Sequence, residues 1–307
     1  MDEVKDKKDD IIKFIYTDKA GFGSIANTLK AARKKDPSIT RQDVKDWIEG
    51  NMDRKTDLKG FNSYIPPGPH YEYQIDLFFM SDLKGESQKR FDTAMCAVDA
   101  FTKFMAVALI SSRGKYDFLA GLMECIATLK GVPKTIYSDD EGSWNAPDVK
   151  KYIEQHHIHL IITRGHAGMV ESAIKTIKGM IYKRLEHDNE RPWYEILGEV
   201  TFVYNHNNVQ RTIEMTPGDA TKPENAAEVK KNIIKHATFT RDYPEVKVGD
   251  TVRIYRKKKS MDKQQKSVWL DGRYTVQEIK EVNGQNFYVT SWDPKKPLLR
   301  PYILKMA

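Results

Sequence analysis

The chain is poor in cysteine and has no long apolar run. Cys96 and Cys125 are its only cysteines, and both stand among apolar residues, which predicts buried free thiols rather than a disulfide framework. The first 69 residues contain no His or Cys and therefore offer no zinc site. No run of about 18 apolar residues occurs, and residues 1–10 lack a signal-peptide core, so we expect a soluble intracellular protein with no membrane partner.

Positive charge is unevenly spread along the 307 residues. The net charge is +7, but residues 246–307 carry 14 Lys and Arg against 6 Asp and Glu, whereas residues 1–245 carry 36 against 37. A basic excess confined to one end is typical of a surface that contacts a phosphate backbone. Within it, the run Arg256, Lys257, Lys258 and Lys259, followed by Lys263 and Lys266, favours nucleic-acid contact over a merely solvated charge run.

Three acidic residues stand where a metal site would need them. Asp76 lies inside an apolar strand-like run, Asp139 follows a second such run at 135–138, and Glu171 opens an amphipathic helix. A carboxylate on a central strand is costly unless something pairs with it, and three that converge would repel one another. Divalent cations such as Mg²⁺ or Mn²⁺ remove that cost. The alternative is three unrelated acids.

The helix after Glu171 carries two different faces. Lys175 and Lys178 follow Glu171 at +4 and +7, which puts them on one side of a helix, where they would neutralise phosphates beside a metal ligand. The alternative is an ordinary Glu–Lys pair on a solvated face. The opposing stripe, which we expect to pack on the core, consists of Ile174, Ile177, Ile181 and Leu185.

These motifs resemble the catalytic core of retroviral and retrotransposon integrases. The resemblance rests on Gln74-Ile75-Asp76-Leu77, on Ile136-Tyr137-Ser138-Asp139, on His166 to Glu171 with Lys175 and Lys178, on Trp193, on Tyr204-Asn205 and on Met215-Thr216-Pro217. It covers roughly residues 20–305. The version here is most similar to integrases of Polinton or Maverick transposons and of virophages.

The resemblance implies a fold and an activity. It implies an α/β fold with an RNase H-like mixed sheet, an N-terminal helical module and a C-terminal SH3-like β-barrel. Asp76, Asp139 and Glu171 would hold two Mg²⁺ or Mn²⁺ ions, with no zinc, for 3′-end processing and strand transfer of a mobile element's or virus's DNA. Such a DDE-type polynucleotidyl transferase, with nuclease activity, would act as a homo-oligomer on element ends and target DNA, in the nucleus or in a viral factory or virion.

The sequence departs from the family pattern at the second acid. The usual motif reads Asp-x-Gly, whereas this chain reads Asp139-Asp140-Glu141-Gly142. Counting back from the glycine selects Asp140. Counting from the strand end selects Asp139, which we prefer because the sheet fixes a strand terminus.

In the predicted loop 163–170, His166, Thr163 and Arg164 are candidates to contact a DNA end. The alternative for His166 is that it only packs within the loop.

Five segments are expected along the chain. A helical module at 1–50 has a charged, disordered start and helices at 22–35 and 40–50, with Thr40 as a helix N-cap. It is either a DNA-binding helix-turn-helix or a bundle that packs against the core. A proline-rich linker at 51–70, a catalytic core at 71–225, a polar helix or linker at 226–245 and a basic barrel at 246–307 follow. Asn283-Gly284 signals a hairpin turn.

Two other functions fit the same residues. One is a domesticated, catalytically silent DNA-binding relative, and the other is a nuclease on the same fold. A zinc site at His156, His157, His159 and His166 is disfavoured, because His156 and His157 would point different ways at a helix end and no Cys accompanies the histidines.

Overall fold

The structure is a computed structural model, and the chain divides into two compact units, Met1–Leu58 and Lys59–Ala307. The described residues are 2–18, 21, 23–51, 61–81, 83, 91–111, 115–163, 167–187, 191–256 and 268–306. No helix among them is long and apolar enough to cross a membrane.

In the described part of the first unit, three helices surround a small core. They are α1 (Asp2–Tyr16), α2 (Ile25–Ala32) and α3 (Arg41–Asn51). The expectation that the first turn or two is disordered is wrong, because α1 begins at Asp2. Further along α1, Ile12 and Tyr16 lie four residues apart and are buried, and Tyr16 meets the Trp47 ring at 5.8 Å. The predicted cap of α3 is confirmed, since the Asp43 N–H donates to Thr40 Oγ1 at 3.1 Å.

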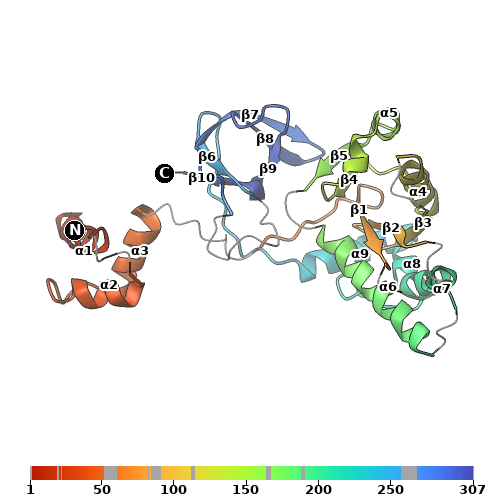
Figure 1. Cartoon of the computed structure of the whole chain (residues 1–307), viewed down its shortest axis with the longest axis horizontal. Coiled ribbons are helices and arrows are strands. Elements are labelled where there is room, and N and C mark those ends of the chain that lie inside the picture. Colours follow the sequence, from red (N-terminus) through yellow and green to blue (C-terminus); the bar gives the residue numbers. More distant parts are fainter. Residues whose placement is uncertain are drawn as a thin grey trace. The chain divides into compact units, whose positions relative to one another are not determined.

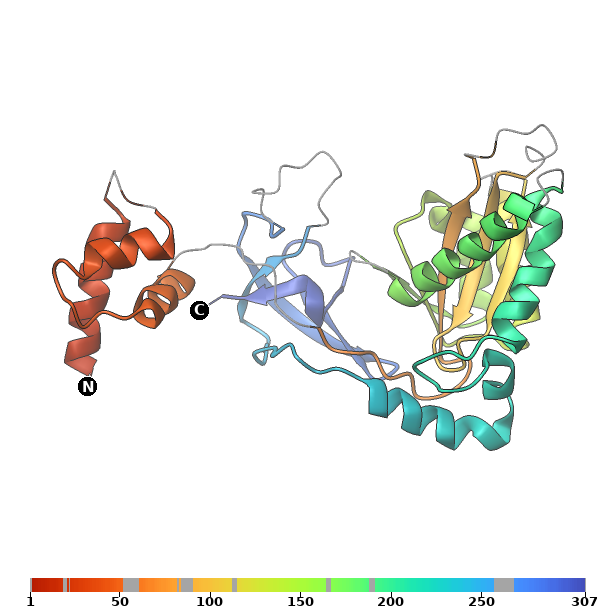
Figure 2. The ribbon, with the colours of Figure 1, turned by 90° about the horizontal axis from the view of Figure 1, so that it is seen from below.

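The second unit contains a five-stranded mixed sheet in the order β3-β2-β1-β4-β5 (Figures 1 and 2). β1 pairs with β2 and β2 with β3 in antiparallel fashion, whereas β4 and β5 continue the sheet in parallel with β1. The predicted order, three antiparallel strands followed by alternating helix and strand, is confirmed. The strands are β1 (Glu72–Phe79), β2 (Thr93–Asp99), β3 (Met105–Ile110), β4 (Thr135–Ser138) and β5 (His159–Ile162).

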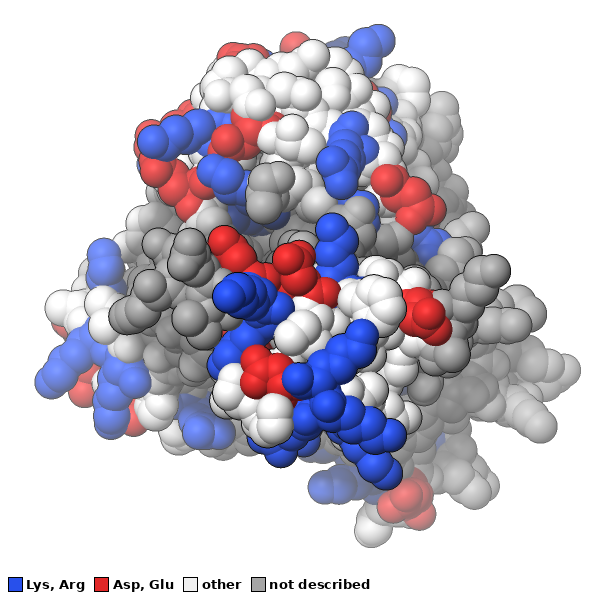
Figure 3. Space-filling view, turned by 90° about the vertical axis from the view of Figure 1, so that its left-hand side faces the viewer, with Lys and Arg blue, Asp and Glu red and all other residues white. Residues whose placement is uncertain are grey.

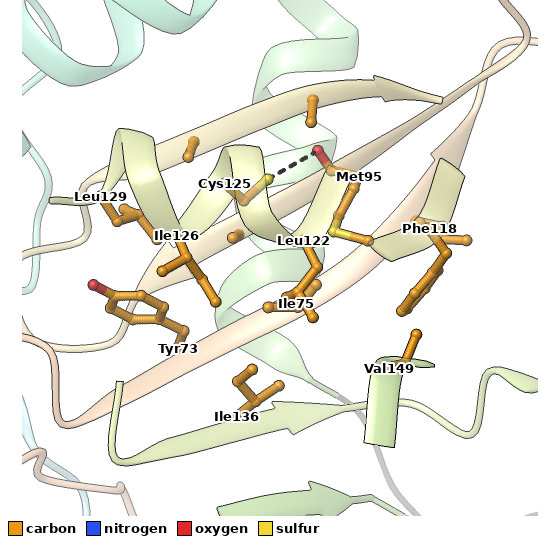
Figure 4. Close-up of a cluster of buried hydrophobic side chains, with 14 of the residues drawn as sticks. Tyr73, Ile75, Met95, Phe118, Leu122, Cys125, Ile126, Leu129, Ile136 and Val149 are labelled. Carbon is orange, nitrogen blue, oxygen red and sulfur yellow. Dashed lines mark hydrogen bonds between the residues drawn. The ribbon is translucent and has the colours of Figure 1, made fainter. Parts of the chain in front are cut away.

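Alternation along β1 divides its side chains between two apolar layers. Tyr73, Ile75 and Leu77 belong to the cluster under α4 (Lys115–Thr128) and α5 (Pro147–Gln155), where Cys125 donates to the Met95 carbonyl at 4.0 Å (Figure 4). The opposite face packs against α6 (Gly168–His187) and α7 (Trp193–His206). Both cysteines are buried free thiols, as predicted.

Helices α6 and α7 match their apolar patterns with one shift in position. Ile174, Ile177, Ile181 and Leu185 are buried as expected. However, α6 begins at Gly168, so Glu171 lies inside its first turn rather than at its start, and the predicted loop is shorter. In α7, the Asn205 side chain binds the backbone of Met105 through both its oxygen (2.9 Å) and its nitrogen (2.8 Å), which gives that part of the motif a structural role.

A second sheet follows the core, with the antiparallel order β10-β6-β7-β8-β9. Asn283 and Gly284 have φ values of 51° and 73°, so the predicted hairpin turn joins β7 to β8. We call this part the C-terminal sheet. Its strands are β6 (Thr251–Ile254), β7 (Tyr274–Val282), β8 (Gln285–Thr290), β9 (Leu298–Leu299) and β10 (Ile303–Lys305).

The segment before the C-terminal sheet is more than a polar tether. The short helix α8 (Pro217–Ala220) precedes α9 (Ala226–His236), which buries Val229 and Ile233 in an apolar cluster that includes Phe101. Beyond α9, the chain pairs with the segment that precedes β1, through Ser63 N–H to Thr238 O at 2.8 Å and Thr240 N–H to Phe61 O at 3.1 Å. These bonds tie the two linkers to each other.

Candidate functional site

Asp76 lies in the middle of β1, on the face that α6 covers. Its neighbours on this face are Gln74 and Phe78, and Phe78 is buried against the Trp193 ring at 6.0 Å. Asp76 itself is half-buried, and its Oδ1 accepts the Leu77 N–H at 2.8 Å. The carboxylate therefore sits at the border between an apolar layer and solvent.

The register of the sheet brings Asp139 next to Asp76. Ile75 pairs with Ser138 in the parallel β1–β4 ladder, so the following residue of each strand stands at the same level. Ser138 is held from two further sides, because its carbonyl accepts the Thr163 N–H at 2.8 Å and its Oγ accepts the Trp144 indole N–H at 3.1 Å.

Asp139 is the first residue after this anchored strand end. Its Oδ1 is buried, whereas Asp140, one residue further out, is exposed. The geometry thus favours Asp139 over Asp140 as the neighbour of Asp76.

Two hydrogen bonds hold α6 along β1. The Met169 N–H donates to Gln74 Oε1 at 3.0 Å, and Lys178 Nζ donates to the Phe79 carbonyl at 2.8 Å. Glu171 lies about 3 Å further along the helix than Met169, and Asp76 about 7 Å further along the strand than Gln74. The helix that carries Glu171 therefore runs alongside the strand that carries Asp76.

The three carboxylates are not gathered into a closed cluster. Among the described residues, no three His, Cys, Asp or Glu side chains form a group that could hold a metal ion. The donor chemistry of Asp76, Asp139 and Glu171 nevertheless suits a hard divalent cation, which takes carboxylate oxygens. Cys96, opposite Asp76 on β2, does not add a thiolate, since burial above all, then Cys125 and Asp76, raise the pKa of its thiol.

The predicted DNA-contacting residues fall into three groups. Lys175 is exposed, as expected. Lys178 is half-buried and bonded to β1, so the expectation that both lysines face outward is wrong for it, because α6 lies against the strand end there. The structure does not describe the remaining predicted residues of this kind except Arg256, namely Arg164, His166, Lys257, Lys258 and Lys259. Arg256 is half-buried, and its backbone N–H donates to the Val268 carbonyl at 2.6 Å.

Charge on the visible surface is mixed. On the face drawn in Figure 3, Lys and Arg side chains are interspersed with Asp and Glu.

The histidines near β5 have separate settings. The His156 ring lies 2.9 Å from the Tyr152 carbonyl, whereas His159 packs edge-on against Phe287 at 5.0 Å, and burial lowers its pKa. His157 is exposed in a turn with φ 52°.

Sequence reasoning missed a group of three hydroxyls beside the acidic pair. Tyr137 Oη donates to Thr163 Oγ1 at 2.8 Å and lies 2.8 Å from Tyr302 Oη, and the Thr163 and Tyr302 hydroxyls are bonded to each other. We call Tyr137, Thr163 and Tyr302 the hydroxyl cluster. Thr163 is only 3% exposed, so the expectation that it faces a DNA end is wrong. Tyr137 stood inside the second acidic motif, but nothing marked Tyr302.

A cavity of about 830 Å³ adjoins this face. Glu72, Gln74 and Lys103 line it from the core, and Tyr288 and Arg300 line it from the C-terminal sheet. Burial raises the pKa of Glu72 to about 7 and lowers the pKa of Lys103 to about 8. The two charged side chains share the cavity without forming an ion pair within 4.0 Å.

Neither a protein family nor a curated protein matches the sequence. Among solved structures, the cryoEM structure of the simian T-cell lymphotropic virus intasome in complex with PP2A regulatory subunit B56 gamma contains a chain that is 15% identical, with a TM-score of 0.57 over 91% of this chain and 95% of its own. The HTLV-2 integrase catalytic core domain in complex with magnesium is 18% identical in its trimeric and dimeric forms. These cover 50% of this chain and 97% and 96% of their own, with TM-scores of 0.44 and 0.43. At such identities the likeness is one of fold, and the chain has an integrase-like fold.

Proposed function

We propose that this protein is a DNA integrase, a polynucleotidyl transferase that trims the 3′ ends of an element's DNA and joins them to target DNA. The observation that carries the proposal is the register of β1 and β4, which sets Asp76 beside Asp139 on the face covered by α6, the helix that carries Glu171. An integrase-like fold with acids at these positions supports phosphoryl transfer over a purely structural role.

Asp76, Asp139 and Glu171 would hold the divalent cations, Mg²⁺ or Mn²⁺. When bound, such cations supply Lewis-acid stabilisation of the phosphoryl oxygens and of the attacking and leaving oxygens. The residues themselves have distinct tasks. Ser138 and its partners fix Asp139, and the Gln74–Met169 bond fixes the start of the helix that carries Glu171.

The lysines of α6 would bind the DNA backbone. Lys175 is exposed on the helix that carries Glu171 and is free to neutralise a phosphate near the acids. Lys178 mainly ties α6 to the end of β1. The basic residues of the C-terminal sheet, which we infer to be an SH3-like barrel, would bind duplex DNA further from the reaction.

We infer relationship to the integrases of Polinton or Maverick elements and virophages from the motif sequences. Action as a homo-oligomer follows from the need to join two DNA ends to one target. The site of action would be the nucleus, or a viral factory or virion.

One assay separates the candidate functions. The full chain is incubated with a labelled blunt duplex from the end of the element that encodes it, a supercoiled plasmid, and Mg²⁺ or Mn²⁺. Joined products are expected, and they should disappear in Asp76→Asn. Nicking without joining would identify a nuclease, and a mobility shift without any product a silent DNA-binding relative. Either outcome overturns the proposal.

A further inference from the structure

We propose that Tyr302, in the C-terminal sheet region, is a positioning residue for the acidic pair, so that this part of the chain supports the reaction as well as DNA binding. The proposal rests on the function proposed above, because it assigns Tyr302 to the site of Asp76 and Asp139.

Three neighbouring strands place Thr163 beside Asp139. The parallel β4–β5 ladder pairs Ser138 with Ile162, so Thr163 follows β5 at the level where Asp139 follows β4. Asp76 stands at the same level on the other side of Asp139. The alternation of strand side chains puts all three on one face of the sheet. Asp139 is thus flanked by Asp76 on β1 and by Thr163 after β5.

Tyr137 lies on the same face of the sheet as Asp76, Asp139 and Thr163, and it lies on β4, ahead of Asp139. It lies two residues before Asp139 and therefore on the same face, and it pairs in register with Gln74, the residue that anchors α6. Its hydroxyl donates to Thr163 Oγ1 at 2.8 Å.

Tyr302 joins these two supports. Its hydroxyl bonds to both Tyr137 and Thr163, and its own side chain is only 8% exposed. Its ring packs on Tyr255 at 6.0 Å, and its carbonyl accepts the Tyr255 N–H at 2.8 Å, so the phenol is held firmly from the C-terminal side. A buried hydroxyl network of this kind fixes its members when every polar atom is satisfied.

The C-terminal sheet also contacts the first residues of β4 and β5. Asn283 Nδ2 donates to Thr135 Oγ1 at 3.1 Å at the start of β4, and Phe287 packs on His159 at the start of β5. Tyr302 completes the contact at the ends of both strands, next to Asp139. The C-terminal sheet thus braces the two strands whose ends flank the second carboxylate.

The test removes one oxygen atom, the hydroxyl oxygen of Tyr302. Tyr302→Phe keeps the ring and removes the hydroxyl, and Tyr274→Phe makes the same change in the apolar core of the same sheet. In the full chain with Mg²⁺, we expect Tyr302→Phe to lower the maximal joining rate about tenfold and to raise the Mg²⁺ concentration needed for half-maximal rate. The Kd for duplex DNA should stay within about twofold, and Tyr274→Phe should match the wild type. Each tenfold change corresponds to about 1.4 kcal/mol.

A double-mutant cycle tests whether Tyr302 acts through Tyr137. Tyr137→Phe should resemble Tyr302→Phe, and the loss in the double variant should be smaller than the sum of the two single losses, because both single variants break the Tyr137–Tyr302 bond. Rates and metal dependence equal to those of Tyr274→Phe would overturn the proposal. So would a loss of DNA affinity that accounts for the whole loss of rate.

Hydrogen exchange separates this inference from the proposed function. Without metal or DNA, Tyr302→Phe should speed amide exchange at 138–141 and 162–163, whereas Tyr274→Phe should not. If the wild type joins no DNA but this exchange difference appears, the proposed reaction fails and the positioning of this strand end stands. Unchanged exchange beside an active wild type refutes the positioning alone.

Discussion

Gln74 and Met169 join the central strand to the first turn of the helix that carries Glu171, through a hydrogen bond of 3.0 Å from the Met169 N–H to Gln74 Oε1. A helix N-terminus has backbone donors without partners inside the helix, and here a strand side chain supplies one acceptor. The same strand carries Asp76 two residues later. The spacing between two carboxylates on different elements therefore depends on a neutral side chain.

Replacing Gln74 should loosen this junction. Gln74→Leu leaves the Met169 N–H without its acceptor, which should cost about 1–2 kcal/mol of unfolding free energy and lower the joining rate more than DNA affinity. Urea unfolding and the joining assay measure the two effects. Gln155→Leu, an exposed change at the end of α5, is the control. Equal stability and activity in the two variants would show that α6 is positioned by its apolar face alone.

The acidic residues should be individually essential for joining but not for folding. We expect Asp76→Asn, Asp139→Asn and Glu171→Gln each to abolish joining while the circular dichroism spectrum is retained, because each removes an anionic ligand from a shared cation site. The exposed Asp140→Asn is the control and should stay active. An inactive Asp140→Asn beside an active Asp139→Asn would reverse the assignment of the second acid.

Much of this site was predictable because it depends on local pattern and strand order. Asp76 and Asp139 each follow from an apolar run, and the parallel crossover then brings them together. The position of α1 was not predictable from its charged sequence, because Tyr16, one of its buried residues, meets a partner 31 residues away in Trp47. Tyr302 was hidden for the same reason, since its hydroxyl finds Tyr137 across 165 residues.

The two lysines of α6 should now behave differently. Lys175→Ala should reduce the salt dependence of DNA affinity by about one unit of slope without changing stability, as expected for one lost phosphate contact. Lys178→Ala should in addition cost about 1 kcal/mol of stability, since it removes the donor to the Phe79 carbonyl. Anisotropy titrations at several salt concentrations, with urea unfolding, measure both.

Lys150→Ala is the matched control for these lysines, because Lys150 is exposed on α5, which covers the opposite face of the sheet. It should change neither the slope nor the stability. If Lys175→Ala gives the same slope as Lys150→Ala, then Lys175 is an ordinary surface lysine.

Glu72 should make stability depend on pH. Burial raises its pKa from 4.5 to about 7, so the folded protein binds a proton more tightly than the unfolded chain. The resulting stabilisation is present below pH 4.5 and is lost as the pH rises to about 7, by about 3 kcal/mol at most. Lys103 acts in a separate range, because burial lowers its pKa from 10.5 to about 8 and stability rises between these values.

Glu72→Gln should flatten the lower part of this profile. The difference in unfolding free energy between pH 5 and pH 7 should shrink relative to the wild type, whereas Glu154→Gln, an exposed change on α5, should leave the profile unchanged. Thermal or urea unfolding at several pH values gives the comparison. A wild-type profile retained in Glu72→Gln would assign the pH dependence to another group.

Removing residues 246–307 should affect both charge and structure. The remaining 245 residues carry 36 Lys and Arg against 37 Asp and Glu, so their long-range attraction to a polyanion is small, and affinity for random duplex should fall with a shallower salt slope. The cut should also destabilise the core, because it removes Tyr302 from Tyr137 and Phe287 from His159.

A variant that keeps the C-terminal sheet separates the effect on charge from the effect on structure. Replacing the exposed Lys295 and Lys296 by Gln should weaken DNA binding and leave the thermal midpoint unchanged. If the truncated protein, the double variant and the wild type bind random duplex equally well, the C-terminal sheet does not bind DNA, and its bracing of β4 and β5 is then its main contribution to the site.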